Sequence, residues 1–171
     1  MDADQLREIQ APLKGKYKDE PGTARILLKA SGSLAGDGLT CRVETGKAMV
    51  EAGLHPATGG NGMQACSGDM LLEALVACAG VTMKAVATAI GINLRDGKVT
   101  AEGNLDFRGT LGVSKDAPVG FEDIRLHFEL DTDADEEQLN TLMKLTERYC
   151  VIYQTLNSPP AVEVSRSVSG G

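Results

Sequence analysis

The sequence predicts a single domain of the α+β class, with strands and helices in the order β-β-β-α-β-β-α-β. Several segments alternate apolar and polar residues with the period of two that half-buried strands show. Two longer segments instead repeat apolar residues with the period of a helix. The chain has 171 residues, of which 42% are hydrophobic, and this is enough to bury one sizeable core.

The N-terminal part of the chain predicts a polar arm and then three short strands. Residues 1–23 are charged and interrupted by Pro12 and Pro21, so we expect a short helix or arm there and the domain itself at 24–166. The strands are expected in the runs ARILLKASG, LTCRVETG and KAMVEAGL, which turn signals separate. The run HPATGGNGMQACSGD is a glycine-rich connection, because clustered glycines disfavour a stable helix.

Residues 70–90 predict a long central helix. Glu73, Lys84 and Thr88 fall on one narrow stripe, and the remaining residues are apolar or small. Such a helix is expected to be buried almost all round, with small side chains that allow another backbone to approach closely. Two charges lie within the helix and no second apolar span occurs, so a membrane-spanning role is not expected.

The C-terminal half predicts two strands, a second helix and a last strand. The segments 98–109 and 121–131 alternate with period two. Asp133 is the expected N-cap of the second helix, with Glu136 three residues later as in a capping box, and the apolar stripe continues through Cys150. The run AVEVS predicts the last strand, and residues 167–171 are expected to be a disordered tail.

Composition excludes several functional classes. A net charge of −7 argues against nucleic acid or an anionic membrane surface as a partner. The N-terminus has no apolar segment of the secretory type, so we expect a cytoplasmic protein with reduced cysteines. The four cysteines form no C-x-x-C pair, and there are two histidines, so a metal site is not expected. Nucleotide-binding and G-x-S-x-G motifs are absent, and no bound cofactor is expected.

Cys78 and Cys150 both lie on apolar helix faces. Either cysteine taken alone is explained as a small hydrophobic core residue. Two thiols on the inward faces of the two long helices are a more specific signal, because packed helices bring such thiols within disulfide range. The sequence leaves open whether these helices pack together.

The chain resembles the OsmC/Ohr family. The resemblance rests on SGDMLLEALVACAGVTMKAVA after a glycine-rich loop and on TERYCVIYQTL some seventy residues later, and it spans roughly residues 24–165. It implies an intertwined homodimer with antiparallel sheets wrapped around central helices. It also implies a peroxidase for organic hydroperoxides, in which Cys78 is the peroxidatic cysteine and Cys150 resolves the sulfenic acid as a disulfide. An external dithiol, of lipoyl type in the best-known branch, would restore both thiols.

The chain departs from that branch in the residues that activate the reactive cysteine. The branch pairs an early loop arginine with a glutamate ten residues before the cysteine, where this chain has Gly68 followed by Asp69. Asp69 and Arg42 are the nearest substitutes. In a straight helix Asp69 lies about 13.5 Å along the axis from Cys78, so it would reach a thiol only through a bend or across the dimer. Stabilisation of the helix N-terminus is the other interpretation of Asp69.

Alternatives to a Cys78/Cys150 peroxidase remain at this stage. The missing arginine leaves room for a non-catalytic OsmC-like module that binds a small apolar or thiol-bearing ligand in the dimer cleft. Cys66 is a second candidate for the resolving thiol, or a loop residue without a role. Cys41 is expected in the sheet core, His55 in a turn-stabilising role, and His127 on the polar side of a strand.

Overall fold

A computed structural model describes residues 3–33, 42–43, 53–63 and 65–166 of the chain. Its sheet has four antiparallel strands in the order β2-β1-β3-β4. The strands are β1 (Arg25–Ser33), β2 (Arg42–Val43), β3 (Leu94–Asp106) and β4 (Phe121–Thr132). In the register, Arg25 of β1 faces Asp106 of β3, and Ala101 of β3 faces Leu126 of β4. The α+β class is thereby confirmed.

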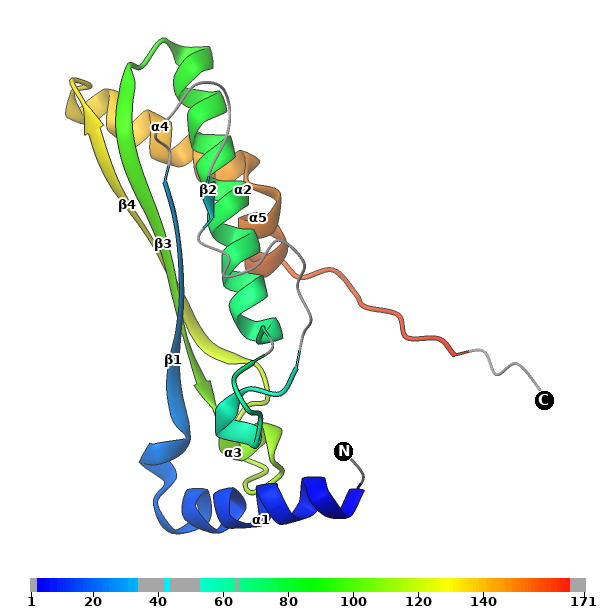
Figure 1. Cartoon of the computed structure of the whole chain (residues 1–171). Coiled ribbons are helices and arrows are strands. Elements are labelled where there is room, and N and C mark those ends of the chain that lie inside the picture. Colours follow the sequence, from blue (N-terminus) through cyan, green and yellow to red (C-terminus); the bar gives the residue numbers. More distant parts are fainter. Residues whose placement is uncertain (1–2, 34–41, 44–52, 64, 167–171) are drawn as a thin grey trace.

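Five α-helices and two 3₁₀ turns accompany the sheet in the described residues. They are α1 (Ala3–Asp19), α2 (Ser67–Ile90), α3 (Phe107–Thr110), α4 (Glu136–Tyr149), α5 (Val151–Asn157), η1 (Pro21–Ala24) and η2 (Pro56–Thr58). The long helix α2 runs beside the long strands, α4 and α5 pack against it, and α1 crosses one end of the molecule (Figure 1). The polar N-terminal arm is thus largely helical, and it packs on η2 and α3, with the Tyr17 hydroxyl donating to the Ala57 carbonyl at 2.7 Å.

The core forms between α2 and the sheet. Leu72, Val76 and Met83 of α2 are fully buried, together with Val99 of β3 and Leu142 of α4. Burying one such side chain contributes about 1.5–3 kcal/mol. By length and composition α2 could cross a membrane, but much of its surface lies in this core. The helix ends at Gly91, whose φ of 74° favours glycine.

One face of α2 is exposed in the single chain, so the prediction of burial almost all round is wrong for the isolated chain. Met70, Ala74, Val81 and Ile90 are exposed. The sheet packs on one side of α2, and the helices α4 and α5 pack on another side. Among the described residues, no layer covers the face of α2 that carries Met70 and Val81.

The second helix starts later than predicted and ends earlier. Its N-cap is Asp135, not Asp133, because β4 continues to Thr132 before the chain turns. The capping box is formed with Gln138: its N–H donates to the Asp135 carboxylate at 2.8 Å, and its amide oxygen accepts from the Asp135 N–H at 3.0 Å. The helix stops at Tyr149, and Cys150 takes an extended conformation (φ −73°, ψ 107°) before α5 begins.

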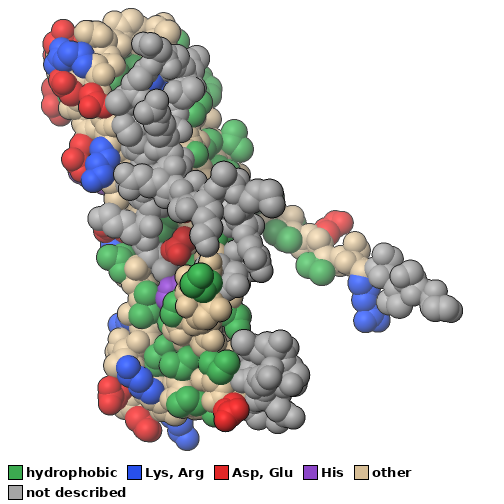
Figure 2. Space-filling view, viewed as in Figure 1, with side chains coloured by type: hydrophobic (Ala, Val, Ile, Leu, Met, Phe, Trp, Pro, Cys, Tyr) green, Lys and Arg blue, Asp and Glu red, His purple; other side chains and the backbone are tan. Residues whose placement is uncertain are grey.

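The predicted last strand, AVEVS, is not formed in the single chain. Residues 159–166 have no regular structure and extend away from the domain, with hydrophobic side chains on the extension (Figures 1 and 2). Val162 and Val164 are 83% and 93% exposed. A strand needs a neighbouring edge, and the extension reaches none within the described part of this chain.

Two further differences concern the other strands. The segment 98–109 is a strand only as far as Asp106, since that side chain caps the short helix α3 by accepting from the Arg108 N–H. Most of the predicted third strand, KAMVEAGL, and the predicted tail at 167–171 lie outside the described residues.

Candidate functional site

The fold brings Cys78 and Cys150 into direct contact. Cys78 lies near the middle of α2, and Cys150 is the single residue between α4 and α5, both of which pack on α2. The two side chains are hydrogen-bonded to each other, and both are free thiols. Cys150 is 1% exposed, whereas Cys78 is half-buried, so Cys78 is the more accessible of the two.

The surroundings of Cys78 favour its thiolate. Burial raises the pKa of the Cys78 thiol, but hydrogen bonds from the Ile152 N–H, the Cys150 thiol, the Val151 N–H and the Thr82 hydroxyl together lower it below its ordinary value. The two N–H groups are available because they begin α5, where N–H groups have no intrahelical acceptor. The helix break at Cys150 therefore supplies donors to the sulfur of Cys78.

The pKa of the Cys150 thiol is shifted in the opposite direction, above its ordinary value. Burial raises its pKa to about 11, and the hydrogen bond and the charge of Cys78 act in the same direction. Cys150 therefore keeps its proton at neutral pH and donates it toward the Cys78 sulfur. The pKa values of the two thiols are therefore shifted in opposite directions, so Cys78 gives up its proton more readily than Cys150.

Thr82→Val is expected to slow alkylation of Cys78 by iodoacetamide roughly tenfold at pH 7, because the hydroxyl bond to the charged sulfur is lost in a side chain of similar shape. The measurement is the rate of labelling against pH, with the labelled peptide identified by mass spectrometry. Thr88→Val is the matched control, since the Thr88 hydroxyl donates to the Lys84 carbonyl on the same helix. Equal labelling rates in wild type and Thr82→Val would contradict this role.

The structure does not bring Asp69 to the thiols. Asp69 lies in the first turn of α2, near His55 and Glu73. Burial raises its pKa, and His55 lowers it; the groups that shift the Cys78 pKa do not include Asp69. The backbone of Arg42 belongs to β2, and its side chain lies outside the described structure. Among the described residues, no cation contributes to the lowered pKa of Cys78.

The remaining candidate residues are His55, His127, Cys66 and Cys41. His55 caps η2, where its Nδ1 accepts from the Ala57 N–H at 3.0 Å, and its ring stacks on Phe107 at 4.8 Å, so the turn-stabilising prediction is confirmed. His127 is exposed on a strand, as predicted. Cys66 is the N-cap of α2, about 18 Å along the helix from Cys78. Cys41 lies outside the described residues, and in the described part no group of His, Cys, Asp and Glu side chains could hold a metal ion.

Sequence reasoning missed the hydrogen-bond donors to Cys78. The sequence could have indicated Thr82 as a donor, because residues four apart, such as Cys78 and Thr82, share a helix face. The sequence could not have indicated the N–H groups of Val151 and Ile152, since the apolar stripe predicted an unbroken helix through Cys150.

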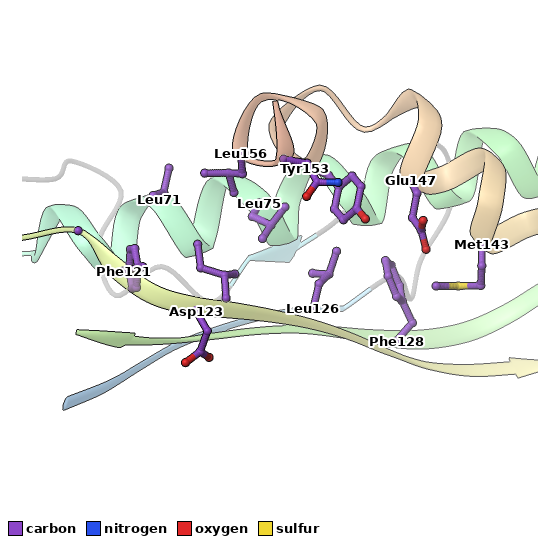
Figure 3. A pocket seen from close by; sticks show the side chains of 13 residues that line it. Leu71, Leu75, Phe121, Asp123, Leu126, Phe128, Met143, Glu147, Tyr153 and Leu156 are labelled. Atoms are coloured by element: carbon purple, nitrogen blue, oxygen red, sulfur yellow. The ribbon is translucent and has the colours of Figure 1, made fainter. Parts of the chain in front are cut away.

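An apolar pocket of about 670 Å³ opens between α2, β4, α4 and α5 (Figure 3). This volume is in the range of small-molecule sites. Its apolar walls include Leu71, Leu75, Leu126, Phe128, Tyr153 and Leu156. Leu71 and Leu75 precede Cys78 by seven and three residues on the same helix face, and Tyr153 follows Ile152, whose N–H bonds the sulfur. The pocket therefore shares α2 and α5 with the thiol site, although Cys78 and Cys150 are not among the residues that line it.

Comparison with known proteins identifies a family and a fold for this chain. The sequence model of the family described as OsmC-like protein matches residues 59–165. An OsmC-like hydroperoxide resistance protein from Jannaschia sp. CCS1 has a similar structure, with a TM-score of 0.62 and 14% identity over 86% of this chain and 97% of that chain. An OsmC-like protein from Mycoplasma pneumoniae gives a TM-score of 0.55 and 16% identity over 75% of this chain and 86% of that chain. The sequence has no significant match among curated proteins.

Proposed function

Because the chain belongs to the OsmC-like protein family, we propose that it is a thiol-dependent peroxidase that reduces organic hydroperoxides with Cys78 and Cys150. The observation that carries the proposal is the direct contact between a cysteine of lowered pKa and a cysteine of raised pKa. The apolar pocket between α2, β4, α4 and α5 has a size that suits the organic part of such a substrate. The hydroperoxide resistance protein among the similar structures supports the same chemistry.

The proposed reaction starts at the Cys78 thiolate. Its sulfur attacks the terminal oxygen of the hydroperoxide, the O–O bond breaks, and the departing alkoxide takes up a proton to become the alcohol. Cys78 is thereby oxidised to the sulfenic acid. The sulfur of Cys150, on losing its proton, then attacks the Cys78 sulfur; an S–S bond forms and the sulfenic oxygen leaves as water. An external dithiol returns two electrons and two protons and restores both thiols, so no bound cofactor takes part, and a reducing compartment such as the cytoplasm suits the cycle.

The direct test is oxidation of the purified protein with one equivalent of cumene hydroperoxide at pH 7. We expect loss of both thiols, release of cumyl alcohol, and a 78–150 disulfide within one chain in the peptide map. Added dithiothreitol is expected to restore the thiols and sustain turnover. Recovery of both thiols unmodified after excess peroxide would reject the peroxidase and favour a module that binds ligands without catalysis.

We further propose that the protein is a homodimer in which the partner covers what a single chain leaves exposed. On its exposed face α2 carries the apolar side chains of Met70, Ala74 and Val81, and the extension with Val162 and Val164 pairs with no strand among the described residues. Sedimentation at micromolar concentration is expected to give a mass near twice 18.0 kDa. Truncation after residue 158 is expected to weaken the dimer at least about tenfold, since it removes the exposed valines. A monomeric full-length protein would contradict the proposal.

A further inference from the structure

The hydroxyl of Thr146, on α4, is buried and makes no hydrogen bond. Thr146 is 1% exposed, and among the described residues its Oγ1 alone of the buried side-chain nitrogen and oxygen atoms has no partner. Buried polar groups in native proteins are almost always hydrogen-bonded, because an unsatisfied one loses its hydration without compensation. A valine has nearly the same shape and would avoid this cost. In the reduced protein the hydroxyl therefore contributes nothing to the fold by hydrogen bonding.

Thr146 lies one helical turn before Cys150 on the buried side of α4. The Cys150 N–H donates to the Thr146 carbonyl at 2.9 Å, so this last turn of the helix is closed. Leu142, Thr146 and Cys150 follow one another at intervals of four residues and are each at most 1% exposed, because α4 packs on α2 (Figure 1). Residues four apart in a helix have Cβ atoms about 5–6 Å from each other, so rotation about the Cα–Cβ bonds brings the hydroxyl and the sulfur within hydrogen-bond reach.

Oxidation of Cys78 changes what the Cys150 sulfur needs. In the reduced protein the two thiols are hydrogen-bonded to each other, and burial raises the pKa of Cys150 to about 11. The Tyr153 and Ile152 N–H groups of α5 lower this pKa, the hydrogen bond and charge of Cys78 on α2 raise it, and among the described residues no cation acts on it. To resolve the sulfenic acid, this buried thiol has to give up its proton. A further hydrogen-bond donor at its sulfur favours that change, because it stabilises the charged form.

We infer that Thr146 serves the resolving step, its hydroxyl donating to the sulfur of Cys150 as that sulfur gives up its proton and attacks the oxidised Cys78. The inference rests on the proposed peroxidase function. The Cys150 proton passes to the sulfenic oxygen of Cys78, the S–O bond breaks as the S–S bond forms, and the oxygen leaves as water. Thr146 keeps its own proton throughout and takes no part in the attack on the hydroperoxide.

The test follows a single turnover of the reduced protein with one equivalent of cumene hydroperoxide. Dimedone trapping measures the sulfenic acid at Cys78, and mass spectrometry measures the 78–150 disulfide against time. Thr146→Val is expected to form the sulfenic acid at the wild-type rate but the disulfide roughly tenfold more slowly at pH 7, because a hydrogen bond to a charged sulfur is lost. The pH at which the resolving rate is half-maximal should rise by about one unit, since the pKa of the resolving thiol rises.

Two further variants control for shape and for the loss of any hydroxyl. Thr146→Ser keeps the hydroxyl and should form the disulfide at a rate within about threefold of wild type. Thr155→Val is the matched control, because Thr155 is exposed on α5 and its hydroxyl donates to the Val151 carbonyl at 2.8 Å. It should keep the wild-type rate and pH profile.

The first step separates the two ways in which the experiment can fail. If wild type forms neither the sulfenic acid nor the disulfide, the peroxidase function itself is wrong. If wild type forms both, a Thr146→Val variant with the wild-type resolving rate and pH profile overturns the inference, and so does a Thr146→Ser variant that is slowed as much as Thr146→Val. Urea unfolding tests for a folding defect: the midpoint of Thr146→Val should equal or exceed that of wild type, and a lower midpoint with both steps slowed would assign Thr146 a purely structural role.

Discussion

Replacing Cys78 with serine is expected to lower the rate of cumene hydroperoxide reduction by roughly a thousandfold or more. A serine hydroxyl is a weak nucleophile at neutral pH, and the donors from α5 and Thr82 stabilise a thiolate that the variant lacks. The measurement is steady-state consumption of the peroxide with dithiothreitol as reductant. A rate within tenfold of wild type would show that the chemistry takes place elsewhere.

Cys150→Ser is expected to separate the two half-reactions. Its Cys78 should still reduce the first equivalent of peroxide, but the sulfenic acid has no neighbouring thiol and persists or is oxidised further. Mass spectrometry is expected to show additions of one oxygen, then two or three, on the Cys78 peptide. Cys66→Ser is the control, because Cys66 lies at the start of α2, and it should form the 78–150 disulfide as wild type does. A 66–78 disulfide in oxidised wild type, in place of the 78–150 disulfide, would assign the resolving role to Cys66.

The largest expected loss of stability follows from Asp106→Ala. Asp106 is 1% exposed; its carboxylate accepts from the Arg108 N–H at 3.0 Å and from the Arg108 Nε at 3.0 and 3.1 Å. The substitution removes the cap of α3 and leaves the Arg108 guanidinium without its carboxylate. We expect the free energy of unfolding to fall by about 3 kcal/mol in urea titrations at pH 7 and fixed protein concentration. Asp116→Ala, at an exposed position, should change it by less than about 0.5 kcal/mol.

The effect of Asp106 should depend on pH. Hydrogen bonds from the Arg108 side chain hold the pKa of Asp106 below its ordinary value. The stabilisation from the ionised group is therefore complete above the unfolded-state pKa of about 3.9, and it is lost as the pH falls through the lower folded-state pKa. Wild type and Asp106→Asn should differ by a constant amount from pH 5 to 7 and converge in more acidic solution. A difference that grows on acidification would contradict this assignment.

The same ion pair connects stability with the position of the site. Asp106 begins α3, Phe107 of α3 stacks on His55, and His55 caps the turn that leads toward the start of α2. Loss of the cap at Asp106 is therefore expected to loosen the end of the molecule where α1 packs before it affects Cys78 itself.

The sequence by itself determined the α+β class, the long apolar helix at 70–90 and the inward placement of two thiols. These features follow from periodicity, because the spacing of residues along the chain determines which of them share a face of a helix or strand. Periodicity also predicted a helix continuing through Cys150 and a last strand at AVEVS, and both predictions failed. A local pattern records which side chains prefer burial, but it does not show where a helix breaks against its neighbours or whether a strand finds an edge.

The tertiary structure alone decided which groups surround the sulfur. Cys78 and Cys150 are 72 residues apart in the sequence, and they meet because α4 and α5 pack on α2. The break at Cys150 turns the N–H groups of Val151 and Ile152 toward Cys78. Hydrogen bonds and charges act over a few ångströms between residues distant in the chain, so the difference in pKa between the two thiols exists only in the folded protein.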